Sequence, residues 1–437
     1  MSKWLNYIRR IYLKVINSIA FYPSLLAISF LILSFLTIQI EFVSFIMDIK
    51  ENITGALVHS SENARLVLGT IVGGIISLMV FSFSMVMVVL NRATATLSPR
   101  VLPGLISSRF HQIVLGFYIG TIIYSLIMIV NVDSPQNEFS VPSFGILVSM
   151  ILGIVCLGLF VYFIHSISLK IQVDNILNTI FESTKDAIAA ADHEEEAVEI
   201  PDTSNWHKYG THFSGYLKKI DHKSLKSFCE KHTLKVNVKE PIGTYIIKYY
   251  PFLEVNKELD DKQREKLISC FIMYAEEHVT DHYQFGFNQI SEIAIKALSP
   301  GINDPGTAIR AIDLLADLFI QLILIQEQKT ISSEKEDVEI YLQTLSFKEI
   351  LYKTLVPIRK YGSSDVMVLM RLLRSLQQML YADMDRDLFY EEIRGLIDNI
   401  ISCSKEYYKN ELDSSALNQI IDRINYKLPS DMAVDKL

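Results

Sequence analysis

The sequence predicts a mainly α-helical membrane protein in which four transmembrane helices precede a cytoplasmic α+β region. Three observations predict this class. Four apolar runs of spanning length occupy the first third of the 437 residues, strand-like alternation follows between about residues 211 and 256, and amphipathic helical patterns fill the rest. The predicted divisions are a transmembrane domain (1–166), a helical stalk with an acidic loop (167–205), a small β-containing module (206–257) and a helical domain (258–437).

Composition argues against nucleic-acid binding, a disulfide framework and a zinc site. Hydrophobic residues make up 50% of the chain and charged residues 21%, an unusual balance for a soluble protein. The net charge of −8 argues against nucleic acid as a partner, because phosphate binding needs a clustered basic surface. The four cysteines are far apart and include no CxxC pair, so neither a disulfide framework nor a zinc signature is indicated, and the soluble part is expected in a reducing compartment.

The four predicted spans are each long enough to cross a bilayer. They are Phe21–Ile40, Leu66–Leu90, Ile113–Val130 and Phe144–Ile164. Basic residues precede the first run, as in a signal peptide, but the run is too long and no small-residue cleavage site follows it. We therefore expect an uncleaved span.

The charges of the loops predict the orientation. The N-terminus is basic, and the loop between the second and third spans carries Arg92, Arg100 and Arg109, whereas the third loop holds only Asp133 and Glu138. By the positive-inside rule, both termini face the cytoplasm of a bacterial cell, and the chain is a multi-pass protein of the plasma membrane. The three arginines are also candidates for contact with lipid phosphates or a regulatory anion; alternatively, they determine topology only.

Small residues recur at every fourth position inside the spans. The predicted pore or helix-packing positions are Gly69, Gly73, Ser77, Ser84, Gly116, Gly120, Gly145, Ser149 and Gly153. Such stripes let helix backbones approach closely, so they indicate bundle packing; alternatively, Ser77, Ser82, Ser84 and Thr121 line a narrow polar path between helices. No ionisable residue lies at the centre of a span, which disfavours a proton-coupled transporter and leaves a channel or an anchor.

After the fourth span, isoleucines from Ile164 to Ile188 predict a helix that continues as a stalk. The acidic run at 193–205 predicts a loop. Within the β module we expect strands at 215–217, 234–238 and 243–249 with a helix at 225–231, and we expect only helices from Asp260 onward. The apolar run Ile312–Ile325 is short for a bilayer and is interrupted by acidic residues, so it predicts a buried bundle or oligomer helix.

Two of these helices meet at a tight polar elbow within Glu292–Asp313. Asp304 is placed as an N-cap and Pro305 at the first helical position, so the elbow exposes the N-terminus of a helix. Free N–H groups there suit a small anionic ligand, and the candidate ligand-binding residues are Ser299, Asn303, Asp304 and Thr307. The alternative is a well-capped helix–loop–helix that binds no ligand.

The motifs of common enzymes are absent from the sequence. It contains no Walker-type phosphate loop, GxGxxG, GxSxG or recognisable nucleophile pairing, so an enzyme is disfavoured, no cofactor is indicated and no catalytic residue is assigned. A weak metal candidate is the cluster of His278, Asp281 and His282, in which the two histidines would share a face of a continuous helix.

The chain resembles the DUF2254 family of predicted bacterial membrane proteins. The resemblance is carried by the four spans, by Ser98–Arg100 (SPR), by Gly215–Asp221 (GYLKKID) and most specifically by ALSPGINDPGTA at Ala297–Ala308. It extends from about residue 15 to 400. It implies the architecture and the membrane location, and it transfers no activity to this chain.

Three functional hypotheses follow. The first is an oligomeric ion or small-solute channel with a cytoplasmic regulatory domain, embedded in the lipid bilayer as a homo-oligomer. The second is a membrane-anchored sensor or scaffold that binds an anionic ligand or a partner at the Ser299–Thr307 elbow. The third is an enzyme acting at the inner leaflet through the arginine loop and the elbow.

Overall fold

The protein is described by a computed structural model. The described residues are 20–41, 43, 45–46, 48, 50, 57–96, 109–133, 141–170, 172–191, 200–274, 282–323, 329–332, 338–343, 345–382, 389–405, 407–408 and 410–437. The chain divides into two compact units. One contains the long apolar helices up to Gln172, and the other runs from Val173 to Leu437.

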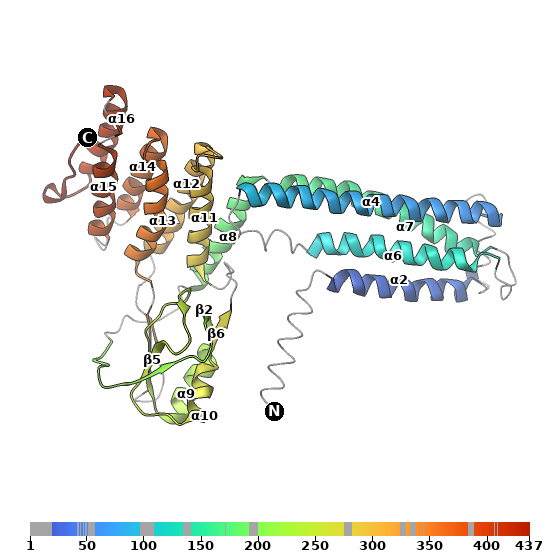
Figure 1. Ribbon diagram of the computed structural model, residues 1–437, viewed down its shortest axis with the longest axis horizontal. Coiled ribbons are helices and arrows are strands. Elements are labelled where there is room, and N and C mark those ends of the chain that lie inside the picture. Colours follow the sequence, from blue (N-terminus) through green and yellow to red (C-terminus); the bar gives the residue numbers. More distant parts are fainter. Residues whose placement is uncertain are drawn as a thin grey trace. The chain divides into compact units, whose positions relative to one another are not determined.

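Four helices long and apolar enough to cross a membrane form the first unit, and they run alongside one another (Figure 1). They are α2 (Phe21–Ile40), α4 (Ser61–Thr96), α6 (Arg109–Asn131) and α7 (Ser143–Lys170). Each predicted span falls within one of them, so the four-helix prediction is confirmed. The 36 residues of α4 extend about 54 Å at 1.5 Å per residue, well beyond a hydrocarbon core of about 30 Å.

Apolar side chains hold this bundle together. Helix α6 packs along α2 and against α7. Leu68 of α4, Tyr124 of α6 and Ile146 of α7 are fully buried in one cluster with residues of α2. A second cluster joins α4, α6 and α7 through Ile75 and Tyr118, among other residues.

The helices of the second unit form a bundle of amphipathic elements. They are α8 (Val173–Ala191), α11 (Tyr283–Ala297), α12 (Pro305–Ile323), α13 (Phe347–Gly362), α14 (Val366–Ala382), α15 (Tyr390–Ser404) and α16 (Glu411–Asn425). Helices α8, α13 and α12 pack on α11, and α14 packs on α12 (Figure 1). Helix α12 is a buried core helix as predicted, and its Asp313 pairs with Arg371 of α14.

Two sheets and two short helices form the β part of the second unit. The strands are β1 (His207–Gly210), β2 (Gly215–Ile220), β3 (Lys235–Val238), β4 (Tyr245–Ile246), β5 (Pro251–Val255), β6 (Phe271–Tyr274), β7 (Lys329–Ser332) and β8 (Glu339–Leu342). One sheet has the order β1-β5-β3-β8-β7, in which β3 and β8 pair in parallel and the other described pairs are antiparallel. The other sheet has the antiparallel order β4-β2-β6.

The helices α9 (His222–His232) and α10 (Asp261–Ile268) pack on this β part. Asp221 caps α9 by accepting from the Ser224 N–H (3.2 Å), and a capping box of Asp260 and Gln263 begins α10. Leu225 of α9 and Leu267 of α10 are buried in one core with the strands.

The structure corrects two expectations. The strands β6, β7 and β8 lie in the stretch expected to contain only helices, so that prediction is wrong there. The helix expected to continue as a stalk is divided: α7 ends at Lys170, and α8 belongs to the second unit, where it packs on α11 and α12. The buried face of α8, with Leu177 and Ile180, explains the isoleucine periodicity that predicted a stalk.

Candidate functional site

The elbow between α11 and α12 is closed by its own hydrogen bonds. The Asp304 N–H donates to the last carbonyl of α11 (2.8 Å), and the Asn303 N–H donates to the Ser299 carbonyl (2.9 Å). Asp304 is the N-cap, as predicted: its Oδ1 accepts from the Thr307 N–H (3.1 Å) and its Oδ2 accepts from the Thr307 hydroxyl (2.6 Å). Asn303 has a left-handed backbone with φ of 50°, a conformation that asparagine tolerates better than most residues.

The four candidate ligand residues therefore lie in one turn, where Asn303 and Asp304 are exposed. The Asp304 carboxylate already accepts from the first turn of α12, where an anion would have to bind. This geometry is that of a capped turn, and an anionic ligand at the elbow stays a prediction.

We expect Asp304→Ala to destabilise the second unit by about 1 kcal/mol, because the substitution removes an N-cap acceptor. Asp304→Asn keeps an acceptor oxygen and is the matched control. The measurement is the thermal unfolding midpoint of the purified protein in detergent. Equal midpoints for Asp304→Ala and Asp304→Asn would show that the cap contributes nothing.

The arginine loop is described only at its two ends. Arg92 lies in α4 and Arg109 begins α6, but their side chains, and the whole of Arg100 with the predicted cap at Ser98, lie outside the described residues. Contact between these arginines and lipid phosphates stays a prediction.

The weak metal candidate lies mostly outside the described residues and stays a prediction. His278 and Asp281 lie outside the described residues, and His282 is the N-cap of α11, with an extended backbone and with its Nδ1 accepting from the Gln284 N–H (3.3 Å). A continuous helix through both histidines is therefore not formed at His282. Within the described part of the chain, no group of three or more His, Cys, Asp or Glu residues could hold a metal ion.

The two cysteines of the β part are packing residues. Burial raises the pKa of Cys229 to about 12 and that of Cys270 to about 11, so both thiols stay protonated at neutral pH.

The small residues of α6 lie at contacts with α2. A Cβ added to Gly120 would lie 2.7 Å from the Phe30 ring, and a Cβ added to Gly116 would lie 2.6 Å from the Leu26 side chain. Both glycines therefore serve the packing of one helix of this chain on another.

The small residues of α7 lie at similar contacts. A Cβ on Gly145 would lie 2.6 Å from the Met128 sulfur, and one on Gly153 would lie 3.6 Å from Ile71 of α4. The stripes of α6 and α7 are thus largely used inside the bundle.

Buried hydroxyls also join α6 to α7. Ser125 and Ser149 share a hydrogen bond of 2.6 Å, and the Thr121 hydroxyl lies 3.4 Å from the Cys156 sulfur. All four side chains have an exposed fraction of 0%, so protein atoms surround these polar groups completely.

The predicted polar path is therefore divided. Ser82 and Thr121 are buried within the bundle, whereas Ser77 and Ser84 are exposed on α4. These four residues do not line one common path inside a single copy of the chain.

Helix α4 carries a set of small residues that point outward. Gly69, Gly73, Ser77 and Ser84 are all exposed, and among the described residues nothing lies within 4 Å of a Cβ built on Gly69 or Gly73. At about 100° per residue these four positions form one stripe, here called the α4 stripe, on the side opposite the buried Ala64, Leu68 and Ile75. The Ser77 hydroxyl donates to the Gly73 carbonyl (2.9 Å), so the stripe has a satisfied polar group in its middle.

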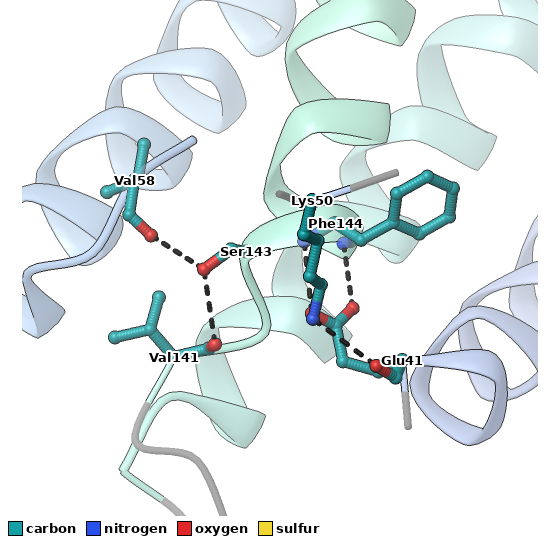
Figure 2. A network of polar contacts seen from close by, with 7 residues as sticks. Glu41, Lys50, Val58, Val141, Ser143 and Phe144 are labelled. Atoms are coloured by element: carbon teal, nitrogen blue, oxygen red, sulfur yellow. Dashed lines mark hydrogen bonds and ion pairs between the residues drawn. The ribbon is translucent and has the colours of Figure 1, made fainter. Parts of the chain in front are cut away.

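A buried carboxylate connects the end of α2 to the start of α7 (Figure 2). Glu41 follows the last residue of α2, and its side chain is 2% exposed. Its Oε1 accepts from the Phe144 N–H (3.1 Å) and its Oε2 accepts from the Gly145 N–H (3.2 Å). Lys50 forms an ion pair with Oε1 and also donates to the Glu41 carbonyl (3.3 Å).

This network connects three segments that are distant in sequence. The Glu41 carboxylate satisfies two free N–H groups at the start of α7, where the helix dipole also favours a negative charge. The Ser143 hydroxyl donates to the Val58 carbonyl (2.8 Å), which joins the start of α7 to the segment before α4 (Figure 2). Sequence reasoning missed Glu41; the signal was a single acidic residue directly after an apolar run.

A polar cluster on the five-stranded sheet was also missed. The Glu254 carboxylate accepts from the Thr203 hydroxyl (2.6 Å) and the Asn237 amide (3.1 Å), and it pairs with Lys239 (3.2 Å). Burial acts to raise the pKa of Glu254, but these hydrogen bonds outweigh it and hold the pKa below its usual value. The alternation of Lys235, Asn237 and Lys239, along β3 and directly after it, was the available signal. Because its carboxylate is paired with Lys239, we assign this cluster to stability.

Comparisons with known proteins agree with the membrane architecture. The family model described as "Predicted membrane protein (DUF2254)" matches residues 16–378. The uncharacterized protein MT1328 of Mycobacterium tuberculosis (strain CDC 1551 / Oshkosh) is 24% identical over 330 residues, which cover 72% of this chain and 63% of that protein. The uncharacterized protein Mb1321c of Mycobacterium bovis matches with the same identity and coverage. The chain thus spans less than two thirds of the length of these relatives, and no solved structure matches it.

Proposed function

Because this chain belongs to the DUF2254 family of predicted membrane proteins, we propose that it forms an oligomeric ion or small-solute channel in the bacterial plasma membrane. In this proposal several copies meet along α4, and the second unit regulates the assembly from the cytoplasm.

The observation that carries the proposal is the outward direction of the α4 stripe. Helix α2 exposes large apolar side chains, including Ile28, Ile32 and Phe35, as expected of a surface that faces lipid tails. The α4 face also exposes large apolar side chains such as Leu66 and Val80, but between them the α4 stripe exposes glycines and hydroxyls, and at these small residues another helix can approach closely. A second copy of the chain supplies such a helix.

The same observation supports a conduit between copies. The hydroxyls of Thr121, Ser125 and Ser149 between α6 and α7 are enclosed by protein, so a path between these helices within one copy would have to displace packed side chains. The exposed hydroxyls of Ser77 and Ser84, repeated around a ring of α4 helices, would give a polar lining without a charged residue.

The orientation in this proposal follows from the loop charges. The basic N-terminus and Arg92, Arg100 and Arg109 favour the cytoplasmic side for both termini, and hence for the second unit. Residues 171 and 172 separate α7 from α8 in the sequence. A movement of α8 in the second unit could therefore be transmitted to the membrane helix α7 through a short connection.

Two measurements on matched variants test the proposal. We expect the purified protein in liposomes to conduct ions, and we expect Gly73→Leu to abolish most of that flux because the added side chain separates neighbouring α4 helices. Ser29→Leu adds bulk to the exposed face of α2 and should leave flux unchanged.

Cross-linking reports assembly independently of flux. In a Cys403→Ser background, which removes the exposed native thiol, Ser77→Cys should form a disulfide-linked dimer in membranes and Ser29→Cys should not. Absence of flux under varied voltage, pH and tension, together with equal cross-linking at both positions, would contradict the proposal. That result would favour an anchored sensor with the elbow as its ligand site.

A further inference from the structure

Two neighbouring loops of the β part form an exposed aromatic projection. Residues 211–214 connect β1 to β2, and residues 247–250 connect β4 to β5. The Tyr249 N–H donates to the Thr211 carbonyl (2.8 Å), and the Lys248 N–H donates to the Ser214 hydroxyl (2.9 Å). These bonds fix the two loops against each other. Phe213, Ile247, Tyr249 and Tyr250 of these loops, together with Tyr245 of β4, form what we call the aromatic tip.

The side chains of the aromatic tip are open to the surroundings. Their exposed fractions are 49% for Phe213, 53% for Tyr245, 57% for Ile247, 64% for Tyr249 and 43% for Tyr250. Four consecutive residues, 247–250, are exposed, and three of them are large and apolar or aromatic. Soluble surfaces rarely concentrate such residues without a partner.

The backbone of the tip is strained at its most exposed ring. Tyr249 has φ of 68°, a left-handed conformation that is rare for a bulky residue and costs roughly 1–3 kcal/mol. The turn is held by the Tyr250 N–H, which donates to the Ile247 carbonyl (3.1 Å). The fold therefore maintains an unfavourable conformation that keeps this ring outside the core.

Basic residues outnumber acidic residues in the segment that carries the tip. Residues 207–250 contain nine lysines but only three acidic residues, although the whole chain has a net charge of −8. The Lys248 ammonium lies 4.6 Å from the centre of the Tyr249 ring, and it is exposed. One acidic group is close, since Glu240 accepts from the Tyr250 hydroxyl (2.9 Å).

We infer that the aromatic tip inserts into the headgroup region of an anionic bilayer. Tyrosine and phenylalanine rings beside an exposed lysine favour the membrane interface, where the rings meet the acyl boundary and the ammonium group meets lipid phosphates. The inference rests on the proposed cytoplasmic location of the second unit, because the cytoplasmic leaflet carries the anionic surface potential.

Because the chain is anchored in the membrane, the tip can dock on the bilayer even if its own affinity for lipid is low. The four spanning helices keep the second unit near a bilayer at all times, so docking of the tip is an intramolecular event with a high effective concentration. A second protein copy is the less suitable occupant, since lysine is depleted from the cores of protein interfaces.

Fluorescence quenching in nanodiscs tests the inference with the full chain. Trp4→Phe and Trp206→Phe remove the two native tryptophans, and Ile247→Trp places a reporter in the tip. In discs that contain anionic lipid, acyl-brominated lipids should quench this reporter strongly. Lys248→Gln should weaken the contact about fivefold, the factor that corresponds to about 1 kcal/mol per lysine near an anionic surface.

The matched control is Tyr352→Trp, which places the reporter on α13 at a residue that is 64% exposed, like Tyr249. Quenching at Ile247→Trp that is no greater than at Tyr352→Trp would overturn the inference. Emission that is blue-shifted but unquenched would do so too, because it would mean that protein covers the tip. Quenching reports lipid contact whatever the chain conducts, so loss of quenching and loss of flux are separate results.

Discussion

Replacing Glu41 with alanine is expected to destabilise the membrane bundle by about 3–5 kcal/mol, the cost of leaving a buried ion pair without one partner. The substitution also removes the acceptors for the Phe144 and Gly145 N–H groups at the start of α7. Unfolding of the purified protein in increasing amounts of denaturing detergent, followed by far-ultraviolet circular dichroism, measures the change.

Two further variants test how much of this destabilisation comes from the ion pair and how much from burial of the carboxylate. Lys50→Ala should cost less than Glu41→Ala, because the carboxylate keeps both N–H donors of α7. Arg65→Ala breaks an ion pair with Asp133 in which the two side chains are 57% and 40% exposed, so it should cost only about 0–1 kcal/mol. Equal losses for Glu41→Ala and Arg65→Ala would mean that burial of the carboxylate adds nothing.

Gly286→Ala in α11 is expected to destabilise the second unit by about 2 kcal/mol. An added Cβ would overlap with the Thr184 hydroxyl of α8 and lie 2.8 Å from the Thr184 Cβ, which is attached to the backbone and cannot rotate away. Overpacking of this kind destabilises a protein by up to about 3 kcal/mol. The higher helix propensity of alanine stabilises the helix by about 1 kcal/mol and so offsets part of this loss. The thermal unfolding midpoint reports the balance.

A second glycine provides a control whose substitution should change the stability in the opposite direction. Gly395 lies in α15 with nothing among the described residues within 4 Å of an added Cβ, so Gly395→Ala should stabilise the protein by up to about 1 kcal/mol. Combining Gly286→Ala with Thr184→Gly should recover the α8–α11 contact apart from about 1 kcal/mol for the new glycine in α8. A Gly286→Ala protein as stable as Gly395→Ala would contradict the close approach of these helices.

The parts of the fold that were predictable depend on local patterns. The four spans follow from uninterrupted apolar runs, and the elbow follows from the order of Pro300, Gly301, Asp304 and Pro305, which ends one helix and caps the next. Both signals act within a few residues, so no knowledge of tertiary contacts was needed.

The missed strands depend on distant partners. The segment of β6, Phe271–Tyr274, is a short apolar run directly after α10, and such a run cannot be distinguished from a helix by periodicity. Strand β8 is stabilised by β3, with Val236 beside Ile340, which no local pattern around residue 340 reveals. Tertiary pairing determined these elements.

The candidate functional residues likewise divide into those that a local pattern predicts and those that depend on distant partners. Gly73 and Gly120 occupy equivalent positions in small-residue stripes, yet one is exposed and the other meets Phe30. Spacing predicts that a helix can approach but not which helix does so. Glu41 was overlooked for a related reason, since its N–H donors lie more than a hundred residues later in the chain.

The parallel pairing of β3 with β8 has a consequence for biosynthesis. The ribosome completes β3 roughly a hundred residues before it reaches Ile340, an interval of about 5–20 s at usual elongation rates. Throughout that interval the nascent sheet has an open edge next to Val236, where strands of other chains can pair. A message truncated within α12 would therefore yield a product whose membrane helices are complete but whose sheet is not, and we expect quality-control proteases to remove it.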